Sequence, residues 1–245
     1  MVQVTERDEA MLEWLTVVRI ADIEGVRWAL GATSGRDQPV TIRRANQWVT
    51  RLAKLGWVDR ARPTFRDGSI IWATHQAIGK TPPNLFKQTT RHEVAVALVS
   101  ARYLAAGYAW RRDRKPAGML DHQVDGVAQK GDRVELVEVE LTPKTWQRYK
   151  QICDNHVFRL DRENVARVAY FCTADAARIV DREADKFIFR TERHKLTAVT
   201  AFDVKGHWIA GDAPVAETVV TAGPESVSSV LQGAAGWGAP GQVEP

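Results

Sequence analysis

The chain has 245 residues, of which 44% are hydrophobic and 26% are charged, and these proportions are ordinary for a globular protein in water. It is long enough for one large domain or two smaller ones, each with a buried core. The formal net charge is +4, but residues 206–245 hold four acids and no Lys or Arg, so the first 205 residues carry +8. A basic folded part favours a polyanionic partner.

No stretch of the sequence approaches the ~20 apolar residues that span a bilayer, and the polar first residues do not resemble a signal peptide. We therefore expect a cytoplasmic protein without a membrane partner. Cys153 and Cys172 are too few for a disulfide framework, which indicates two reduced and mostly buried thiols. No Cys/His cluster has the spacing of a zinc site, so we expect no structural zinc.

Composition divides the chain into three regions. Residues 1–80 form the first, and a connector that contains Pro and Thr, "GKTPPNLFKQTT", lies at 79–90. Residues 81–205 alternate helical and strand patterns. Residues 206–245 are rich in Gly and Pro and lack periodicity, so we expect a largely disordered tail. The predicted fold class is α/β (α+β), with helices around a mixed sheet in the second region.

The first region combines helical patterns with one hairpin. Apolar spacing predicts helices over Glu6–Val18 and Ala21–Leu30. A third helix is predicted between an N-cap at Thr41 and a C-cap at Gly56. Asp-Gly at 67–68, between two extended runs, predicts a β-hairpin. This order is the plan of a winged helix-turn-helix, whose third helix enters the DNA major groove.

The third predicted helix has a polar and basic outer face, and the hairpin is basic as well. Arg suits guanine edges, Asn and Gln suit adenine, and further bases suit phosphates. The residues expected on DNA are Arg43 or Arg44 for guanine, Asn46 or Gln47 for adenine, and Arg51, Lys54, Arg60, Arg62 and Arg66 for phosphates. A basic face can also be merely solvated, and a winged helix can bind protein, but helix and wing together favour double-stranded DNA. Recognition of paired half-sites predicts a homodimer.

The second region reads as a mixed sheet flanked by helices. The expected order is helix 83–107, strand 108–110, strands 122–129 and 133–141 joined by a tight turn, helix 143–155, strand 165–172, helix 174–186 and an edge strand 196–204. The strand over 133–141 carries Val134 and Leu136 on one face and Val137, Val139 and Leu141 on the other, so we expect it to be covered on both sides and central in the sheet.

Carboxylates gather at the other end of this central strand. Glu138 and Glu140 share one face because side chains alternate along a strand. Asp125 approaches the same end if the preceding strand pairs antiparallel. Three converging carboxylates repel one another unless a divalent cation neutralises them, which predicts a site for Mg²⁺ or Mn²⁺ that could activate water. His92 and His122 are candidate general bases, although histidines in such places more often form structural hydrogen bonds.

This combination resembles the PD-(D/E)XK nuclease superfamily, whose core has this element order. The resemblance implies that Asp125 is the first metal-binding acid and Glu138 the second. Glu140 stands at the usual lysine position, which is a departure, and Lys144 could supply a displaced lysine. Glu93 matches an auxiliary acid of several members. The resemblance thus implies a catalytic group formed by Asp125, Glu138, Glu140, Lys144 and Glu93.

A narrower resemblance covers residues 8–190. The motifs "THQAIGK", "RHEVAVAL", "DHQVDGV" and "VEVELTPKTWQRY" are similar to those of the replication-relaxation family of plasmids, phages and integrative elements. It implies a DNA-binding protein of a mobile element, acting in replication, mobilisation or transcriptional regulation, whose nuclease-like domain supports binding without cutting. An Mg²⁺-dependent endonuclease targeted by its winged helix is the second hypothesis. A module that contacts only protein is the third.

Overall fold

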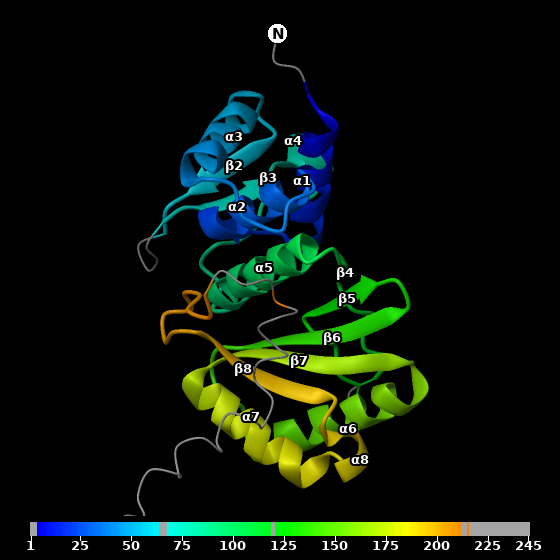
Figure 1. Ribbon diagram of the computed structural model, residues 1–245. Helices are drawn as coiled ribbons and strands as arrows, with labels where there is room; N and C mark the ends of the chain where they lie inside the picture. The colour runs from blue at the N-terminus through cyan, green and yellow to red at the C-terminus, as the bar shows by residue number, and fades with distance from the viewer. Residues whose placement is uncertain (1–3, 64–67, 119–120, 212–214, 216–245) are drawn as a thin grey trace, which may run out of the picture.

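The computed structural model describes residues 4–63, 68–118, 121–211 and 215. This part of the chain is a mixed α/β structure with one three-stranded and one five-stranded sheet, and this class agrees with the prediction (Figure 1). Arg66, which we expect on DNA, lies outside the described residues. Most of the tail that we expect to be disordered lies outside them as well.

The first part of the structure surrounds a small antiparallel sheet in which β3 lies between β1 and β2. Its elements are α1 (Glu6–Val18), β1 (Ala21–Asp22), α2 (Ile23–Ala32), α3 (Ile42–Lys54), β2 (Val58–Ala61), β3 (Ile70–Ala73) and the short α4 (His75–Ile78). The predicted cap of the third helix is confirmed, because the Thr41 side chain accepts a hydrogen bond from the Arg44 N–H. The predicted C-cap is wrong by one residue, since Leu55 is the C-cap and Gly56 follows it with φ of +72°, as a glycine at that position often does.

One expectation for this part is wrong at its boundary. The helix predicted from Ala21 begins at Ile23, since Ala21 and Asp22 pair with β3 as a short strand. The Asp22 carboxylate then accepts a hydrogen bond from the Gly25 N–H at 2.8 Å and caps α2. Apolar spacing could not reveal this strand, because its hydrogen-bond partner lies almost 50 residues away in the sequence.

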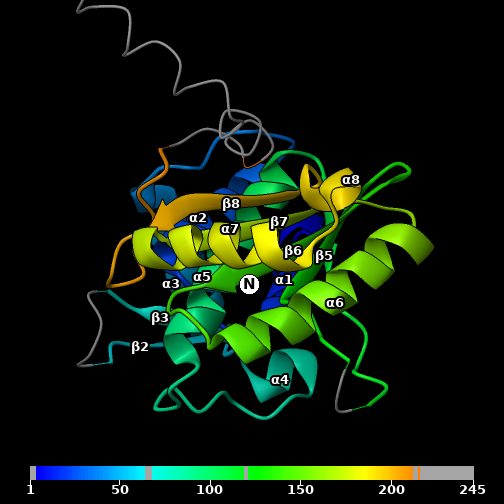
Figure 2. The ribbon, with the colours of Figure 1, turned by 90° about the horizontal axis from the view of Figure 1, so that it is seen from below.

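The second part contains the larger sheet, with strand order β4-β5-β6-β7-β8. Its elements are α5 (Thr90–Ala105), β4 (Ala109–Arg111), β5 (Gly126–Lys130), β6 (Arg133–Glu140), α6 (Trp146–Arg162), β7 (Val165–Thr173), α7 (Ala174–Phe187), α8 (Arg190–Arg193) and β8 (Leu196–Phe202). The first three strands pair antiparallel and the last three parallel, and β6 is central as expected. The helices α6 and α7 cover one face of this sheet and α5 the other (Figure 2).

Three predicted boundaries in this part need correction. The helix expected from residue 83 begins at Thr90, and the helix expected over 143–155 runs from Trp146 to Arg162. The strand expected from His122 begins only at Gly126. Residues ahead of that strand are held by α6 instead of a ladder, because the His122 N–H donates to the Asn155 side chain at 3.0 Å.

Apolar packing joins the two parts across the connector at 79–89. Side chains of α2, α5 and β6 belong to one buried cluster, which includes Val26, Ala97 and Val137. The helix α5 therefore serves both parts, since one face packs on α2 and another on the large sheet. The division near residue 80 stays a prediction, and the shared core favours correlated unfolding of the two parts.

A buried arginine fixes the segment after β8 onto this shared core. The Arg102 guanidinium lies between the Trp28 and Trp208 rings, 4.2 and 4.1 Å from their centroids, and donates to the Gly211 carbonyl at 3.1 Å. A cation stacked between desolvated aromatic faces is held favourably. Trp208 and Gly211, which lie in the region that we expected to be a disordered tail, are thus held against Arg102 of α5.

A buried carboxylate ties α1 to α3. Asp8 forms a capping box with Thr5, accepts the Trp48 indole N–H at 2.8 Å and pairs with Arg51. Burial alone raises the pKa of Asp8, but hydrogen bonds from Arg51, Thr5 and Trp48 outweigh it and lower the pKa to about 2. The orientation of α3 therefore depends on an ionised Asp8.

Asp8→Asn should lower the free energy of unfolding by about 2 kcal/mol at pH 7, because a pKa of about 2 against 3.8 in the unfolded chain stabilises the fold by that order. The depressed pKa means that this stabilisation is present above about pH 4 and is lost as the pH falls toward 2. Urea unfolding at both ends of that range measures it. Glu9→Gln, at an exposed acid on the same helix, should change little, and an equal loss in both variants would contradict the assignment.

Candidate functional site

Two buried glutamates mark the end of the central strand. Glu138 and Glu140, each 5% exposed, lie on the face of β6 that α6 and α7 cover, as side-chain alternation predicts. A third glutamate, Glu135, is fully buried on the opposite face, and we did not predict a role for it. The strand thus carries buried carboxylates on both faces, and the partners of each decide what it can do.

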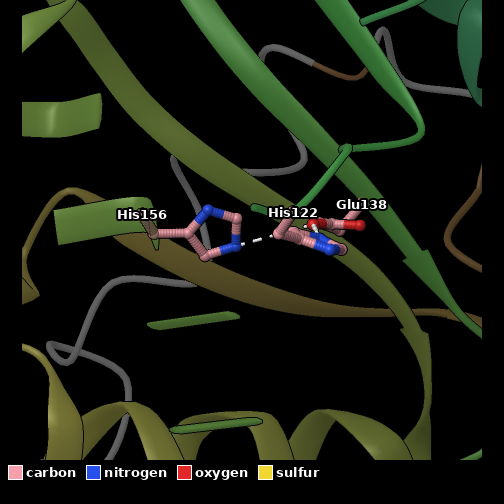
Figure 3. Close-up of side chains that lie close together, drawn as sticks. All are labelled: His122, Glu138 and His156. Atoms are coloured by element: carbon pink, nitrogen blue, oxygen red, sulfur yellow. Dashed lines mark hydrogen bonds and ion pairs between the residues drawn. The ribbon is translucent and has the colours of Figure 1, made fainter. Parts of the chain in front are cut away.

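Two histidines meet Glu138. His122, just before β5, forms a hydrogen bond through Nε2 to Glu138 Oε1, and His156 Nε2, on α6, lies 3.5 Å from the same oxygen (Figure 3). The Tyr170 hydroxyl on β7 lies 2.8 Å from His156 Nε2. Within the described residues, His122, Glu138 and His156 are the one group of three or more His, Cys, Asp or Glu side chains whose ligand atoms converge, all within 4.8 Å.

Burial controls the charge of this group. It raises the pKa of Glu138, an effect that the negative charge of Asp125 increases and the contact with His122 opposes. It also lowers the pKa of His156 well below the usual value, because a charged imidazole is costly where water is excluded. His156 is therefore neutral at physiological pH, with a lone pair available on its ring.

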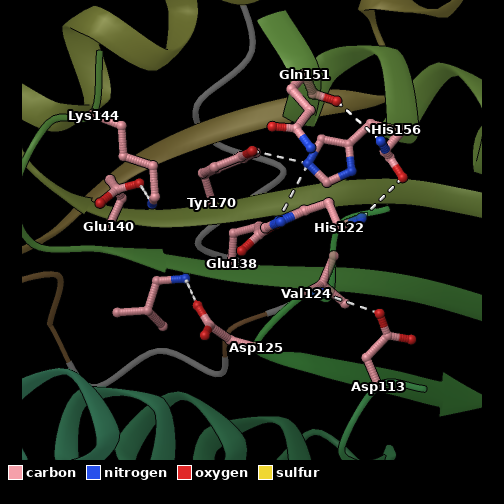
Figure 4. A network of polar contacts seen from close by, with 12 residues as sticks. Asp113, His122, Val124, Asp125, Glu138, Glu140, Lys144, Gln151, His156 and Tyr170 are labelled. Atoms are coloured by element: carbon pink, nitrogen blue, oxygen red, sulfur yellow. Dashed lines mark hydrogen bonds and ion pairs between the residues drawn. The ribbon is translucent and has the colours of Figure 1, made fainter. Parts of the chain in front are cut away.

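Asp125 lies beside this group without joining it. Its carboxylate accepts the Val139 N–H at 2.8 Å and contacts His92 Nε2 at 3.1 Å, so it closes the end of the β5–β6 ladder (Figure 4). Its charge is still close enough to shift the pKa values of Glu138 and Lys144. The structure thus brings Asp125 near Glu138, but each of the two carboxylates is paired with its own histidine.

Glu140 is paired with Lys144, the residue expected as a displaced catalytic lysine. Burial lowers the pKa of Lys144, and the charges of Glu138 and Asp125 oppose that shift. Glu93, the expected auxiliary acid, lies apart from these residues. Its carboxylate accepts a hydrogen bond from the Thr89 hydroxyl group. Its side chain lines a cavity of about 570 Å³ that Asp125, Glu138 and Glu140 do not line.

The expected ligands Asp125, Glu138 and Glu140 are therefore distributed among three separate pairs. Each carboxylate already has a histidine or lysine partner, so mutual repulsion does not require a cation between them. The ring of His156 was missing from our prediction. Its signal was present, since it falls in the inward stripe of α6 with Tyr149 and Ile152, where a polar side chain needs a partner.

Glu135 belongs to a closed structural network. It accepts the Tyr103 and Tyr108 hydroxyl groups at 3.0 Å each and pairs with Arg167 at 2.7 Å and Arg133 at 2.5 Å. These partners use both carboxylate oxygens, and they hold the pKa of Glu135 low against the effect of burial. A saturated carboxylate of this kind stabilises the sheet and is not available to a ligand.

The second candidate surface is the outer face of α3. The helix buries most of its apolar side chains, and its exposed residues are Ile42, Arg43, Arg44, Asn46, Gln47, Thr50, Ala53 and Lys54. Arg60 and Arg62, at the end of β2, are exposed as well. Arg51 differs from the expectation of a free phosphate ligand, because it is half-buried in its ion pair with Asp8.

A cavity of about 450 Å³ opens beside this helix. Four arginines line it, namely Arg7 from α1, Arg36 from the loop before α3, and Arg44 and Arg51 from α3. Arg7 and Arg36 were not among the residues that we expected on DNA, and the tertiary fold brings them to this cavity from α1 and from the loop before α3. Guanidinium groups around one hollow suit phosphate or another anion.

Lys144→Met should destabilise the fold by about 2 kcal/mol, because it leaves the buried carboxylate of Glu140 without its cation. The expected loss of stability is smaller than for a fully buried ion pair, because the Lys144 side chain is one-third exposed. Lys150→Met, in the exposed pair with Asp154, is the matched control and should change stability by less than about 0.5 kcal/mol. Chemical denaturation of both variants measures the difference, and equal midpoints would show that Glu140 does not depend on Lys144.

No protein-family model, curated protein or solved structure matches this chain. In the part of the chain that the structure describes, no helix combines the length and the apolar character needed to cross a membrane. The resemblance to the replication-relaxation family therefore stays a prediction. The geometry of α3 and of the C-terminal end of β6, which carries Glu138 and Glu140, is the basis for a functional proposal.

Proposed function

We propose that the protein binds double-stranded DNA by inserting α3 into the major groove. The observation that carries the proposal is the uncovered face of α3. The helix is anchored from behind by Trp48, Val49 and Leu52, and no other described element covers the side that bears Arg43 and Gln47. It lies at the end of the molecule opposite the five-stranded sheet, where a duplex meets no obstruction from that sheet (Figure 1).

The topology of the first part supports this assignment. Chain order α1-β1-α2-α3-β2-β3, with β3 between β1 and β2, agrees with the plan of the winged helix-turn-helix that we propose. The short β1, which we did not predict, completes the three-stranded sheet of this plan. In such modules the helix that follows α2 reads the groove and the hairpin follows the backbone.

The first turn of α3 has the chemistry of a reading surface. Residues at the N-terminal end of a recognition helix contact base edges, and here they are Ile42, Arg43 and Arg44. An arginine forms two hydrogen bonds with guanine in the major groove, which no other base matches. Ile42 is 57% exposed, an unusual position for its side chain in water, and it suits the methyl group of thymine.

Phosphate contacts surround this surface. Arg7 and Arg36 lie on one side of α3, and Arg60 and Arg62 extend from β2 on the hairpin side. Contacts of this type fix the register of the protein on DNA without reading sequence. Arg51 contributes mainly by fixing α3 on Asp8.

The biological setting in this proposal follows from the resemblance. It is a regulatory or replication-accessory role on a mobile element, with two copies of the chain on paired half-sites. Three carboxylates, those of Asp125, Glu138 and Glu140, are each paired with a histidine or lysine side chain. An Mg²⁺ ion needs oxygen ligands that are free to turn toward it, so this pairing supports DNA binding without Mg²⁺-dependent cutting.

Arg43→Ala combined with Arg44→Ala should weaken binding to a duplex selected from a random pool by about 10- to 100-fold, since loss of the one guanine contact expected from Arg43 or Arg44 costs roughly 1–3 kcal/mol. Fluorescence anisotropy over a range of salt concentrations measures both affinity and salt slope. The control, Arg162→Ala with Arg178→Ala, removes the same charge from exposed positions on α6 and α7. Equal losses in the two double variants would contradict reading by α3.

Supercoiled plasmid incubated with the protein and Mg²⁺ or Mn²⁺ should remain uncut, because the three expected ligands are held in separate pairs. Gel electrophoresis measures nicking, and DNA binding under the same conditions is checked in parallel. Nicking that disappears in Glu138→Gln would overturn this part of the proposal in favour of the endonuclease. DNA binding by α3 would stand in either case.

A further inference from the structure

Two imidazoles and one carboxylate point at a common centre between β6 and α6 (Figure 4). Three ligands around one ion at bond lengths of about 2.1 Å are separated from one another by roughly 3.4 Å. His156 Nε2 and Glu138 Oε1 are 3.5 Å apart, and His122 Nε2 contacts the same oxygen. A small shift of His122 away from Glu138 would place the three ligand atoms at the separations expected around one metal ion.

The three ligands come from separate segments and are all buried. His122 precedes β5, Glu138 lies near the end of β6 and His156 lies in the middle of α6, with exposed fractions of 7, 5 and 0%. Only the tertiary fold assembles them, so no spacing motif announces the group.

The donor set decides which ion fits. Mg²⁺ prefers oxygen ligands and keeps several waters, whereas two of the three ligands here are imidazole nitrogens and the group is buried. Two histidines and one carboxylate are the ligands of zinc sites and of other divalent transition-metal sites. The Tyr170 hydroxyl, 2.8 Å from His156 Nε2, offers an oxygen as a fourth ligand.

We propose that His122, Glu138 and His156 bind one divalent transition-metal ion, with Zn²⁺ as the expected occupant and Tyr170 at the fourth position. The ion joins the segment before β5 to β6 and α6, so its role is structural. In the metal-free protein, the hydrogen bond between His122 and Glu138 takes its place. This site is independent of the DNA-binding proposal, since α3 lies in the other part of the molecule.

The test uses the full chain without an affinity tag. Isothermal titration with Zn²⁺ should give one ion per chain, and millimolar Mg²⁺ should not compete. At Zn²⁺ about a hundredfold above Kd, the Tm should rise by roughly 5 °C or more. Co²⁺ should bind at the same stoichiometry and give visible absorption bands, which Zn²⁺ removes.

Variants locate the ion. His122→Gln and His156→Gln should each weaken Zn²⁺ binding by about a hundredfold or more, because loss of a ligand exceeds the 10- to 100-fold effect of losing a supporting residue. His92→Gln is the matched control, since His92 also contacts a carboxylate, Asp125, but lies outside the group. It should bind Zn²⁺ as the wild type does.

Several outcomes overturn the proposal. One is a wild-type chain that binds neither Zn²⁺ nor Co²⁺ at one ion per chain, a result that needs no variant. A second is a His122→Gln variant that keeps the wild-type affinity for Zn²⁺. A third is a His92→Gln variant that loses as much Zn²⁺ affinity as the His122 and His156 variants, which would place the ion elsewhere. If His156→Gln does not fold, the wild type and His122→Gln decide the question. DNA binding measured on the same samples separates this result from the fate of the DNA proposal.

Discussion

A carboxylate removed from water must be given a partner, and this constraint organises the structure. Asp8 pairs with Arg51, Glu135 with Arg167, Glu138 with His122 and Glu140 with Lys144. The buried pair of Asp113 and Arg159 follows the same rule, with two parallel bonds of 2.7 and 3.0 Å. Each pair joins elements that are distant in the sequence or fixes the end of one element. These pairs therefore fix how the helices and strands are oriented, while apolar packing holds them together.

The two parts of the molecule depend on one another through α5. One face of this helix packs on α2, and the other lies on the sheet, where Tyr103 reaches Glu135. Arg102 adds a cation between two tryptophans from either side of the shared core. The part of the molecule that carries the surface proposed on α3 therefore shares one buried core with the large sheet.

Much of the fold could be predicted because its signals are local. Thr41 as a cap, the turn at Gly131 and the apolar run of β7 each report on a few neighbouring residues. The candidate DNA surface was predictable for the same reason, since a helix separates its two faces by periodicity alone. Arg7 and Arg36 were not found, because they reach α3 only through the packing of other segments.

The sequence by itself determined the order of the longer elements, the face of β6 that carries Glu138 and Glu140, and the basic face of α3, since alternation and helical period are properties of the chain alone. Only the tertiary structure decided which charges meet. It gave His122 and His156 to Glu138, and it left Asp125 with His92. The physical reason is that electrostatic and hydrogen-bond partners are chosen by distance in space, and a sequence pattern carries no information about that distance across separate elements.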